Sequence, residues 1–485
     1  MKLREITAQI EVKALCADPD TEIGGVECDS RRVRPGDLFV AVPGFQADGH
    51  RFIPAAAEKG CAAVLCQTPP EIDVPYILTD DSRLALALAS CAFYRHPSRE
   101  MKVIGVTGTN GKTTTTILVK QLLEKCLGAK VGLVGSIQNM IGNEVFHTEY
   151  TTPESNDLQA LFRAMADAGC GYCVMEVSSH SLALHRVAGT RFFAGLFTNL
   201  TQDHLDFHGT MEEYARAKSL LFAMCEHAAG NLDDGWFQIV MDKAPAPVYT
   251  FSACSDAADL TARDIRLTES EVRFCALEGS ELVRTHLNAP GQFSVYNALA
   301  ALACARMAGI PLRDAAGALP ECSGAKGRVE PVPTDGDYSI YIDYAVTPDA
   351  VENVLRTLRP VASGRLVMLF GCGGDRDRTK RPIMGRISAE LADYVIVTSD
   401  NPRTEDPMAI IEDILPGVQG VGTPYTVICD RREAIRHAIE DHRPGDLILL
   451  CGQGHEDYQI IGHQKIHMDE REIVAEILRE REERK

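Results

Sequence analysis

Positive charge is scarce in this sequence of 485 residues, which has 49 Lys and Arg against 68 Asp and Glu and a formal net charge of -19. This excess of negative charge disfavours attraction to nucleic acid or to an anionic membrane surface, because both carry the same sign. We therefore expect neither as a partner. Any anionic small molecule that the protein binds must meet local positive sites.

Long apolar runs are also missing, so no segment has the length needed to cross a bilayer. The start of the chain, MKLREITAQIEV, lacks the apolar run of a signal peptide. We expect a cytoplasmic location, where the 16 cysteines would be reduced. The Cys-x-x-Cys from Cys170 to Cys173 has no second pair to complete a metal site, which favours structural cysteines.

The length of the chain predicts several domains, because a single core rarely organises so many residues. We predict three α/β domains: a small one over residues 1–100, a central P-loop ATPase-like parallel sheet over 101–326, and a Rossmann-like domain over 327–485. Apolar runs predict strands at 38–42, 63–66, 103–106, 366–370, 394–397, 425–428 and 447–450. Helical patterns predict a helix over 291–307 and an amphipathic closing helix after residue 469, without chemistry.

A glycine-rich turn follows the run at 103–106 and opens a helix-like stretch. In this context backbone N–H groups can cradle phosphates, Lys112 can neutralise their charge and Thr113 can reach a magnesium ion. The strand-turn-helix context disfavours the alternative of a tight turn with an incidental lysine. The Asn-Lys-x-Asp motif of a GTPase is missing, so we predict ATP. The predicted ATP-binding residues here are Gly108, Thr109, Asn110, Gly111, Lys112, Thr113 and Thr114.

Two further strand-like runs end in polar residues. The first ends at Glu176, where a carboxylate in a parallel sheet commonly contacts the magnesium of a bound nucleotide. The second, at 194–197, leads into Asp203 and His204. By residue type alone, His204 is more often a capping or core histidine than a metal ligand, and Lys218 is a solvated helix residue.

Together and in this order, the phosphate loop, Glu176-Val-Ser-Ser-His, Asp203-His-Leu-Asp and Tyr214-Ala-Arg-Ala-Lys218 resemble the Mur ligase family. The resemblance extends over nearly the whole chain. It implies that Thr113, Glu176 and His204 hold Mg²⁺, and that the protein has two Mg²⁺ sites. It also implies that Lys218 is carbamylated and so gains a carboxylate that binds the metal.

The same resemblance implies further binding positions. Asn297, Arg328 and Asp343 would contact ATP; their alternative roles are helix capping and surface ion pairing. A uridine diphosphate group would lie against Ser30, Phe45 and Gln46, and the muramyl dipeptide joined to it against Thr151, Thr152, Ser178 and Arg186. The chain departs from the family pattern at Leu184, Ser294 and Val346, which we leave out of the site.

Three polar turns follow strands of the third domain, and in an open parallel sheet such turns converge on one crevice. They contain Arg376, Asp400 to Arg403, and Gly452 to Glu456. Two arginines and a glutamate suit a zwitterion, since a guanidinium grips a carboxylate and a glutamate accepts from an ammonium. Asp-Asn-Pro-Arg resembles the diaminopimelate-adding type of the family. The predicted residues for that amine are Arg376, Asp400, Asn401, Pro402, Arg403, Gly452 and Glu456.

The implied activity is an ATP-dependent amide ligation in peptidoglycan precursor synthesis, with Lys112, Glu176, His204 and Lys218 as catalytic residues and a monomeric protein. A glutamate γ-carboxylate would attack the ATP γ-phosphate, and meso-diaminopimelate would attack the resulting acyl phosphate. Two alternatives stay open: a ligase of the same family that adds L-lysine, and a non-catalytic nucleotide-binding protein. The second should have lost one of the four catalytic residues, all of which are present.

Overall fold

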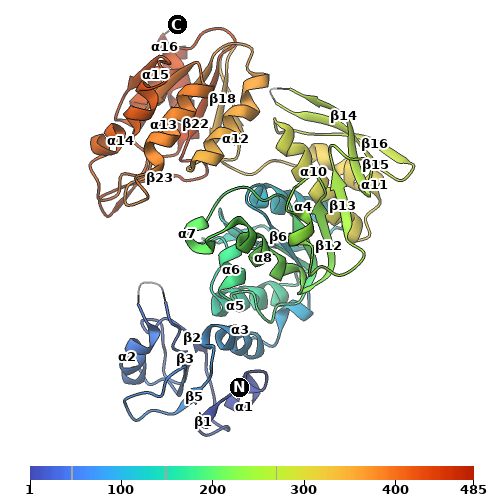
Figure 1. Cartoon of the computed structure of the whole chain (residues 1–485), viewed down its shortest axis with the longest axis vertical. Helices are drawn as coiled ribbons and strands as arrows, with labels where there is room; N and C mark the ends of the chain where they lie inside the picture. Colours follow the sequence, from blue (N-terminus) through green and yellow to red (C-terminus); the bar gives the residue numbers. More distant parts are fainter. Residues whose placement is uncertain (45–46, 147, 149, 269, 485) are drawn as a thin grey trace. The chain divides into compact units, whose positions relative to one another are not determined.

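The computed structural model describes all residues except 45, 46, 147, 149, 269 and 485 (Figure 1). Contacts among the described residues divide the chain into two compact units. The first comprises Met1–Thr261 and Leu299–Ala318, and the second comprises Ala262–Ala298 and Leu319–Lys485. The domain boundaries expected near residues 100 and 326 stay predictions.

The N-terminal sheet has the order β1 (Ala14–Cys16), β5 (Tyr76–Leu78), β4 (Ala63–Cys66), β3 (Leu38–Val40) and β2 (Val26–Glu27). Only β1 is antiparallel to its neighbour. Successive residues of a strand face opposite sides of its sheet, so Leu38 and Leu65 pack in one core and Phe39 and Val64 in another. The helices beside this sheet are α1 (Leu3–Thr7), α2 (Ile53–Glu58) and α3 (Ser82–Phe93).

The central sheet places three polar loops at one edge. From β9 to β14 its order is β9 (Glu144–Phe146), β8 (Asn139–Ile141), β7 (Val131–Val134), β10 (Tyr172–Glu176), β6 (Lys102–Thr107), β11 (Phe192–Phe197), β12 (Cys225–Asn231), β13 (Tyr249–Ser252) and β14 (Leu260–Leu267). The pairs from β7 through β14 are parallel, whereas β8 and β9 add an antiparallel meander. Because Glu176 pairs with Val106 and Phe197 with Thr107, strands β10, β6 and β11 end side by side.

Helices of this first unit follow the strands of its sheet. The phosphate loop opens α4 (Lys112–Leu127), and the chain then forms α5 (Ser155–Asp167), α6 (Ser179–Ala183), α7 (Leu205–His208), α8 (Met211–Phe222), α9 (Phe237–Val240) and α11 (Leu312–Ala318). The helix expected over 291–307 is α10 (Gln292–Met307), whose residues up to Ala298 belong to the second unit and whose remaining residues belong to the first. The strand predicted at 103–106 is confirmed as β6.

The second unit contains a six-stranded sheet in the order β17 (Glu330–Val332), β18 (Ser339–Asp343), β22 (Leu447–Cys451), β19 (Leu366–Phe370), β20 (Tyr394–Val397) and β21 (Tyr425–Val427). All pairs are parallel except β17 with β18. Hence the predicted parallel sheet is confirmed. Helices α12 (Pro348–Leu358), α13 (Lys380–Leu391) and α14 (Pro407–Gln419) share a core with one face, and α15 (Arg431–Glu440) and α16 (Glu470–Arg484) with the other (Figure 1).

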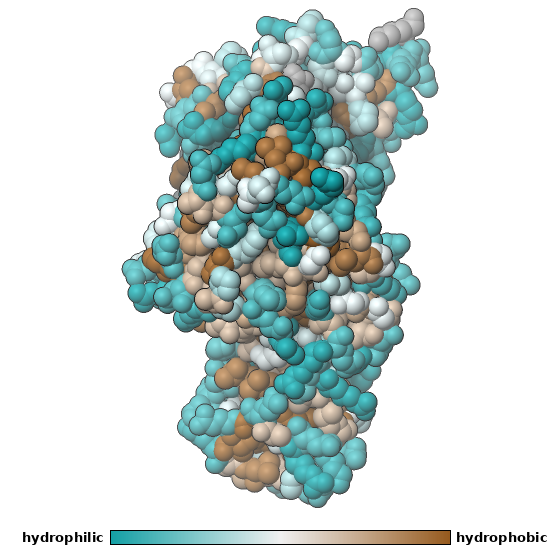
Figure 2. All heavy atoms as spheres, turned by 90° about the vertical axis from the view of Figure 1, so that its right-hand side faces the viewer, coloured by the Kyte–Doolittle hydropathy of each residue, from teal (hydrophilic) through white to brown (hydrophobic). Residues whose placement is uncertain are grey.

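Two antiparallel hairpins complete the second unit: β15 (Val272–Glu278) with β16 (Glu281–Leu287), and β23 (Tyr458–Ile461) with β24 (Gln464–His467). On the face drawn in Figure 2, hydrophobic residues lie in small groups among hydrophilic ones. Within the described part of the chain, no helix combines the length and apolar character needed to span a membrane.

Candidate functional site

The phosphate loop lies between β6 and α4 and is fixed by the loop after β11. Asn110 N–H donates to Asn199 Oδ1 at 2.9 Å, and Thr198 Oγ1 donates to Asn110 O at 2.7 Å. A Cβ at Gly108 would lie 1.9 Å from Thr198 Oγ1, so only glycine fits there. The Lys112 ammonium folds over the loop and donates to Gly108 O at 2.9 Å. The first turn of α4 thus presents backbone N–H groups beside a lysine, as phosphate binding requires.

Glu176 lies beside the first turn of α4, with 1% of the residue exposed. Its carboxylate accepts from Thr113 Oγ1 at 3.1 Å and from Ser136 N at 2.8 Å. Ser136 Oγ lies 3.0 Å from Glu176 Oε2, to which its hydroxyl donates, and also 3.0 Å from the Thr151 hydroxyl oxygen. A carboxylate and a hydroxyl beside a phosphate loop are the oxygen ligands that Mg²⁺ prefers. We did not predict Ser136, which follows its strand without any distinctive motif.

Thr152, Ser178 and Arg186 form a connected group next to Glu176. The Thr152 hydroxyl donates to Glu176 O at 2.9 Å and accepts from Ser178 N at 3.2 Å. The Arg186 guanidinium donates to Thr152 O at 3.1 Å and pairs with Glu154 at 2.6 Å. The structure therefore brings the residues predicted for the muramyl dipeptide to the edge of the sheet that carries the phosphate loop.

Lys218 is buried, contrary to the solvated position expected from its residue type. It lies on α8 with 1% exposed, donates to Gly108 O at 2.8 Å and lies 4.5 Å from the centre of the Tyr214 ring. Burial holds the pKa of the Lys218 ammonium well below its usual value, and the charge of Lys112 lowers it further. Tyr214, which we did not predict, also hydrogen bonds Thr109 through its hydroxyl at 3.2 Å.

His204 caps the short helix α7 in a left-handed backbone conformation, with φ of 54°. Its ring packs edge-on against His180, with ring centres 4.7 Å apart, and lies 6.1 Å from the Tyr214 ring. The Asp203 carboxylate lies 3.3 Å from His204 Nε2. Through Tyr214, His204 belongs to the same neighbourhood as Lys218 and the phosphate loop.

The residues at this edge fit Mg²⁺ on one chemical condition. Among the residues that the structure describes, no three His, Cys, Asp or Glu side chains gather as a metal site. Of the four residues predicted to hold the metal, only Glu176 and His204 are of these types, and the other two are Thr113 and Lys218. A lysine ammonium would repel a cation, and a neutral amine is a poor ligand for Mg²⁺, which prefers oxygen, so a metal held by this set requires Lys218 to carry a carboxylate.

The loop that bears Ser30 is anchored by Glu27, at the end of β2. Glu27 Oε1 accepts from Cys28 N at 2.9 Å, Asp29 N at 3.0 Å and Asn156 Nδ2 at 3.2 Å. Asn156 lies on α5, so the glutamate ties the loop to the central sheet's helices. Burial raises the pKa of the Glu27 carboxyl. Phe45 and Gln46, predicted for the uridine diphosphate group, lie outside the described residues.

Asn297, Arg328 and Asp343 all belong to the second unit. Asn297 is a buried residue of α10. The Asp343 carboxylate ends β18 and accepts from Val329 N at 2.8 Å, while the Arg328 guanidinium lies 5.2 Å from the centre of the Tyr344 ring. Burial raises the pKa of Asp343, and Arg328 opposes that shift. Because Val329 directly follows Arg328, this hydrogen bond places the predicted residues Arg328 and Asp343 in one cluster.

The turns after β19, β20 and β22 meet at one end of the second sheet, as predicted. Asn401 Nδ2 donates to Glu456 Oε2 at 2.7 Å, and Tyr344 donates to Glu456 Oε1 at 3.3 Å. Burial raises the pKa of Glu456. Gly452 has a φ of 119° and lies against the buried Asp400, whose Oδ2 would be 2.3 Å from an added Cβ.

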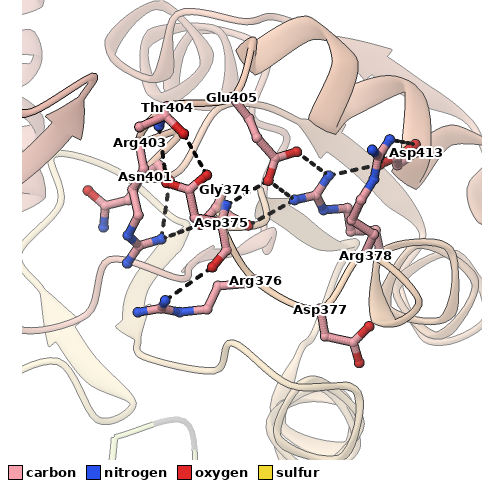
Figure 3. Close-up of polar contacts among 12 residues, drawn as sticks. Gly374, Asp375, Arg376, Asp377, Arg378, Asn401, Arg403, Thr404, Glu405 and Asp413 are labelled. Carbon is pink, nitrogen blue, oxygen red and sulfur yellow. Dashed lines mark hydrogen bonds and ion pairs between the residues drawn. The ribbon is translucent and has the colours of Figure 1, made fainter. Parts of the chain in front are cut away.

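Two arginines flank the turn after β19. A Cβ at Gly373 would lie 2.8 Å from Arg403 Nη1 and 3.9 Å from Arg376 Cγ. Arg403 Nη1 donates to Gly374 O at 2.8 Å. In Figure 3 the guanidinium groups of Arg376 and Arg403 lie together, on the opposite side from the ion pair of Arg378 with Asp413. This end of the sheet offers two cations and the half-buried carboxylate of Glu456, a combination that suits a zwitterionic ligand.

Comparisons with known proteins match this architecture. Three family descriptions match the chain: "Mur ligase family, catalytic domain" over residues 22–94, "Mur ligase middle domain" over 106–305 and "Mur ligase, glutamate ligase domain" over 327–454. A protein of Caldanaerobacter subterraneus subsp. tengcongensis called "UDP-N-acetylmuramoyl-L-alanyl-D-glutamate--2,6-diaminopimelate ligase" is 47% identical over 96% of both chains. A protein of Clostridium botulinum with the same name is 45% identical over 95% of this chain and 96% of its own.

Solved structures give the same result for the fold. One described as "Structure of UDP-N-acetylmuramoyl-L-alanyl-D-glutamate--2, 6-diaminopimelate ligase" has a TM-score of 0.73 and 32% identity, covering 99% of both chains. "Crystal structure I of MurF from Acinetobacter baumannii" has a TM-score of 0.64 and 20% identity, over 99% of this chain and 98% of that one. At that identity the second likeness concerns the fold alone.

Proposed function

Because the chain belongs to the Mur ligase family, we propose that it joins meso-diaminopimelate to the D-glutamate γ-carboxylate of UDP-N-acetylmuramoyl-L-alanyl-D-glutamate, with cleavage of ATP. The product is a peptidoglycan precursor, so the activity serves cell-wall synthesis and, through it, cell shape and division. The observation that supports the choice of amine is that Arg376, Arg403 and Glu456 lie at one end of the second sheet, where they are proposed to form the amine pocket. Diaminopimelate has a zwitterionic far end that these charges suit, whereas lysine has only an amine there.

The residues of the first unit carry the first half of the reaction. N–H groups at the start of α4 and Lys112 bind the γ-phosphate of ATP and offset its charge. Bound Mg²⁺ supplies further neutralisation of that charge. The glutamate carboxylate, held by Thr151, Thr152, Ser178 and Arg186, attacks the γ-phosphorus. ADP leaves, and an acyl phosphate forms.

The amine completes the reaction. Arg376 and Arg403 bind the far carboxylate of diaminopimelate, and Glu456 with Asn401 accepts from its far ammonium. The other amine, in its neutral form, attacks the acyl carbon. The C–O bond to phosphate breaks, phosphate departs, and the nitrogen loses a proton to give the amide. Asn297, Arg328 and Asp343 are proposed to hold the nucleotide, and Ser30, Phe45 and Gln46 the uridine diphosphate group.

Phosphate release tests the choice of amine. We expect ATP-dependent release from UDP-N-acetylmuramoyl-L-alanyl-D-glutamate when meso-diaminopimelate is added, and little when L-lysine replaces it. Lysine lacks the carboxylate that the two arginines would bind, so its binding should be weaker. Mass spectrometry of the product confirms which amine is joined. Turnover with lysine alone would contradict the proposal, and turnover with neither would favour a non-catalytic nucleotide-binding protein.

Carbamylation of Lys218 is the second prediction. Burial lowers the pKa of Lys218 and so favours its neutral amine, which is the form that reacts with CO₂. We expect one protein carbamate signal in the ¹³C NMR spectrum of the enzyme in ¹³C-bicarbonate, strengthened by Mg²⁺. The variant Lys218→Met is its control and should lack the signal. An unmodified amine in the presence of saturating bicarbonate and Mg²⁺ would show that this lysine is no metal ligand.

The monomeric state and the cytoplasmic location expected from the sequence also stay predictions. Analytical ultracentrifugation measures the first directly.

A further inference from the structure

A completely buried ion pair lies beneath the pocket of the second sheet. It joins Arg431, the first residue of α15, to Glu470, the first residue of α16, at 2.8 Å, and both side chains are 0% exposed. Desolvation makes such a pair a poor source of stability compared with apolar side chains of the same size. A cation in the first turn of a helix is also unfavourable, because it meets the positive end of the helix dipole. The pair therefore calls for a role other than stability.

The remaining bonds of the Arg431 guanidinium point to that role. Its Nη1 donates to Ser399 O at 3.2 Å, and its Nη2 donates to Cys451 O at 2.9 Å. Ser399 directly precedes the turn of Asp400 to Arg403, and Cys451 directly precedes Gly452. Strands β20 and β22 are not neighbours, since β19 lies between them in the sheet. The guanidinium therefore bridges two turns that no strand pairing holds together.

The two turns approach each other closely at this bridge. Gly452 has no side chain, and a Cβ there would lie 2.3 Å from Asp400 Oδ2 and 4.0 Å from Arg431 Nη2. Above the bridge the same turns meet again, where Asn401 donates to Glu456 at 2.7 Å. The separation of these two polar groups thus depends on how Arg431 holds the turns.

The next residue of α16 holds the second turn at another point. Arg471 Nη2 donates to Gly454 O at 2.8 Å, and its guanidinium also pairs with Glu330 at 2.6 Å. The start of α16 thus supports the pocket through both Glu470 and Arg471. We had predicted α16 as a closing helix without chemistry, and its first turn has this additional connection.

We propose that Arg431, Glu470 and Arg471 are positioning residues that fix the distance between Asn401 and Glu456 and thereby the selectivity for the amine substrate. None of the three touches the substrate. The inference rests on the proposed function, because it concerns the pocket assigned to diaminopimelate. Its consequence is specific: loosening the bridge weakens recognition of that amine and leaves the phosphate loop unaffected.

The test uses the full-length enzyme with Arg431→Met and Glu470→Met combined, which removes both buried charges together and leaves neither unpaired. We expect KM for diaminopimelate to rise roughly ten- to hundredfold, since displacement of binding groups by about an ångström has effects of that size. KM for ATP should not change, and the preference for diaminopimelate over lysine should fall. Arg471→Met, at a site 19% exposed, is the second variant if the first does not fold.

The matched control is Arg365→Met with Asp446→Asn. These two residues pair at 2.7 Å, with side chains 18% and 1% exposed. They directly precede β19 and β22, so they lie at the end of the sheet opposite to the turns. Hydrogen exchange of the amides of Asp400, Asn401, Arg403 and residues 452–456 provides a readout independent of activity, and should be faster in the Arg431 and Glu470 variant only. Unchanged exchange and an unchanged KM for diaminopimelate in a folded variant would overturn the inference. If the wild-type enzyme does not use diaminopimelate, the proposed function is refuted instead. Hydrogen exchange would still test whether Arg431 holds the two turns together.

Discussion

Lys218→Met is expected to remove turnover while leaving the protein at least as stable as the wild type. Without the proposed carbamate, the site loses the group that allows its set of side chains to hold a metal. We expect kcat to fall by at least about a hundredfold, the effect of losing one preorganised electrostatic group. Stability should not fall, because Met has nearly the shape of the lysine stem, and Gly108 O keeps its bond from Lys112 at 2.9 Å. Phosphate release and urea unfolding measure the two effects.

The pH dependence of stability tests whether burial lowers the pKa of Lys218 in the folded protein. Because the folded pKa of Lys218 is depressed, the unfolded chain takes up a proton there at a higher pH than the folded chain does. The wild type therefore loses stability as pH falls from the ordinary lysine pKa toward the folded pKa, and this loss stops below it. Met does not titrate, so in bicarbonate-free buffer the advantage of the variant in free energy of unfolding should grow through that window.

Lys243→Met is the matched control, since Lys243 is an exposed lysine of the same unit. It should change neither kcat nor the pH dependence of unfolding. A Lys218→Met enzyme that keeps its kcat would show that the lysine has no catalytic part, and a less stable one would show that its ammonium is well solvated in the folded protein.

Much of the fold could be predicted because its signals are local. Apolar runs identified strands such as β6, β19 and β22, since a buried parallel strand is apolar on both faces. The phosphate loop was predictable because its glycines have conformations or contacts that exclude other residues, as at Gly108. The convergence of polar turns followed from strand direction alone.

The burial of charged helix residues could not be predicted from residue type. Lys218, Arg431 and Glu470 each lie in a helix with charged neighbours in sequence, which is typical of a solvated face. Only packing between elements far apart in the chain buries them, as where Lys218 on α8 meets the phosphate loop. For Lys218, the family resemblance indicated the site where residue chemistry did not. For Arg431 and Glu470, nothing in the sequence pattern indicated it.

The backbone at Arg403 is held independently of its side chain. The residue has a left-handed φ of 51°, which costs about 1–3 kcal/mol for a residue with a Cβ. Hydrogen bonds to the β23–β24 hairpin hold it there: Arg403 N donates to Ile460 O at 3.0 Å, and Gly462 N donates to Arg403 O at 2.7 Å. Shortening the side chain should therefore remove the guanidinium without releasing the turn.

Arg403→Ala is accordingly expected to raise KM for diaminopimelate by roughly ten- to hundredfold, because bonds to a charged group contribute about 1.5–3 kcal/mol. KM for ATP should stay the same. Arg403→Lys should recover little, since an ammonium cannot bind a carboxylate through two parallel bonds. Arg378→Ala is the control: it removes a nearby arginine that pairs with Asp413 on the other side of the turn (Figure 3). If both alanine variants lose diaminopimelate to the same extent, general damage to the domain explains the loss. If neither does, the far carboxylate is bound elsewhere, and the choice of diaminopimelate over lysine does not depend on this pocket.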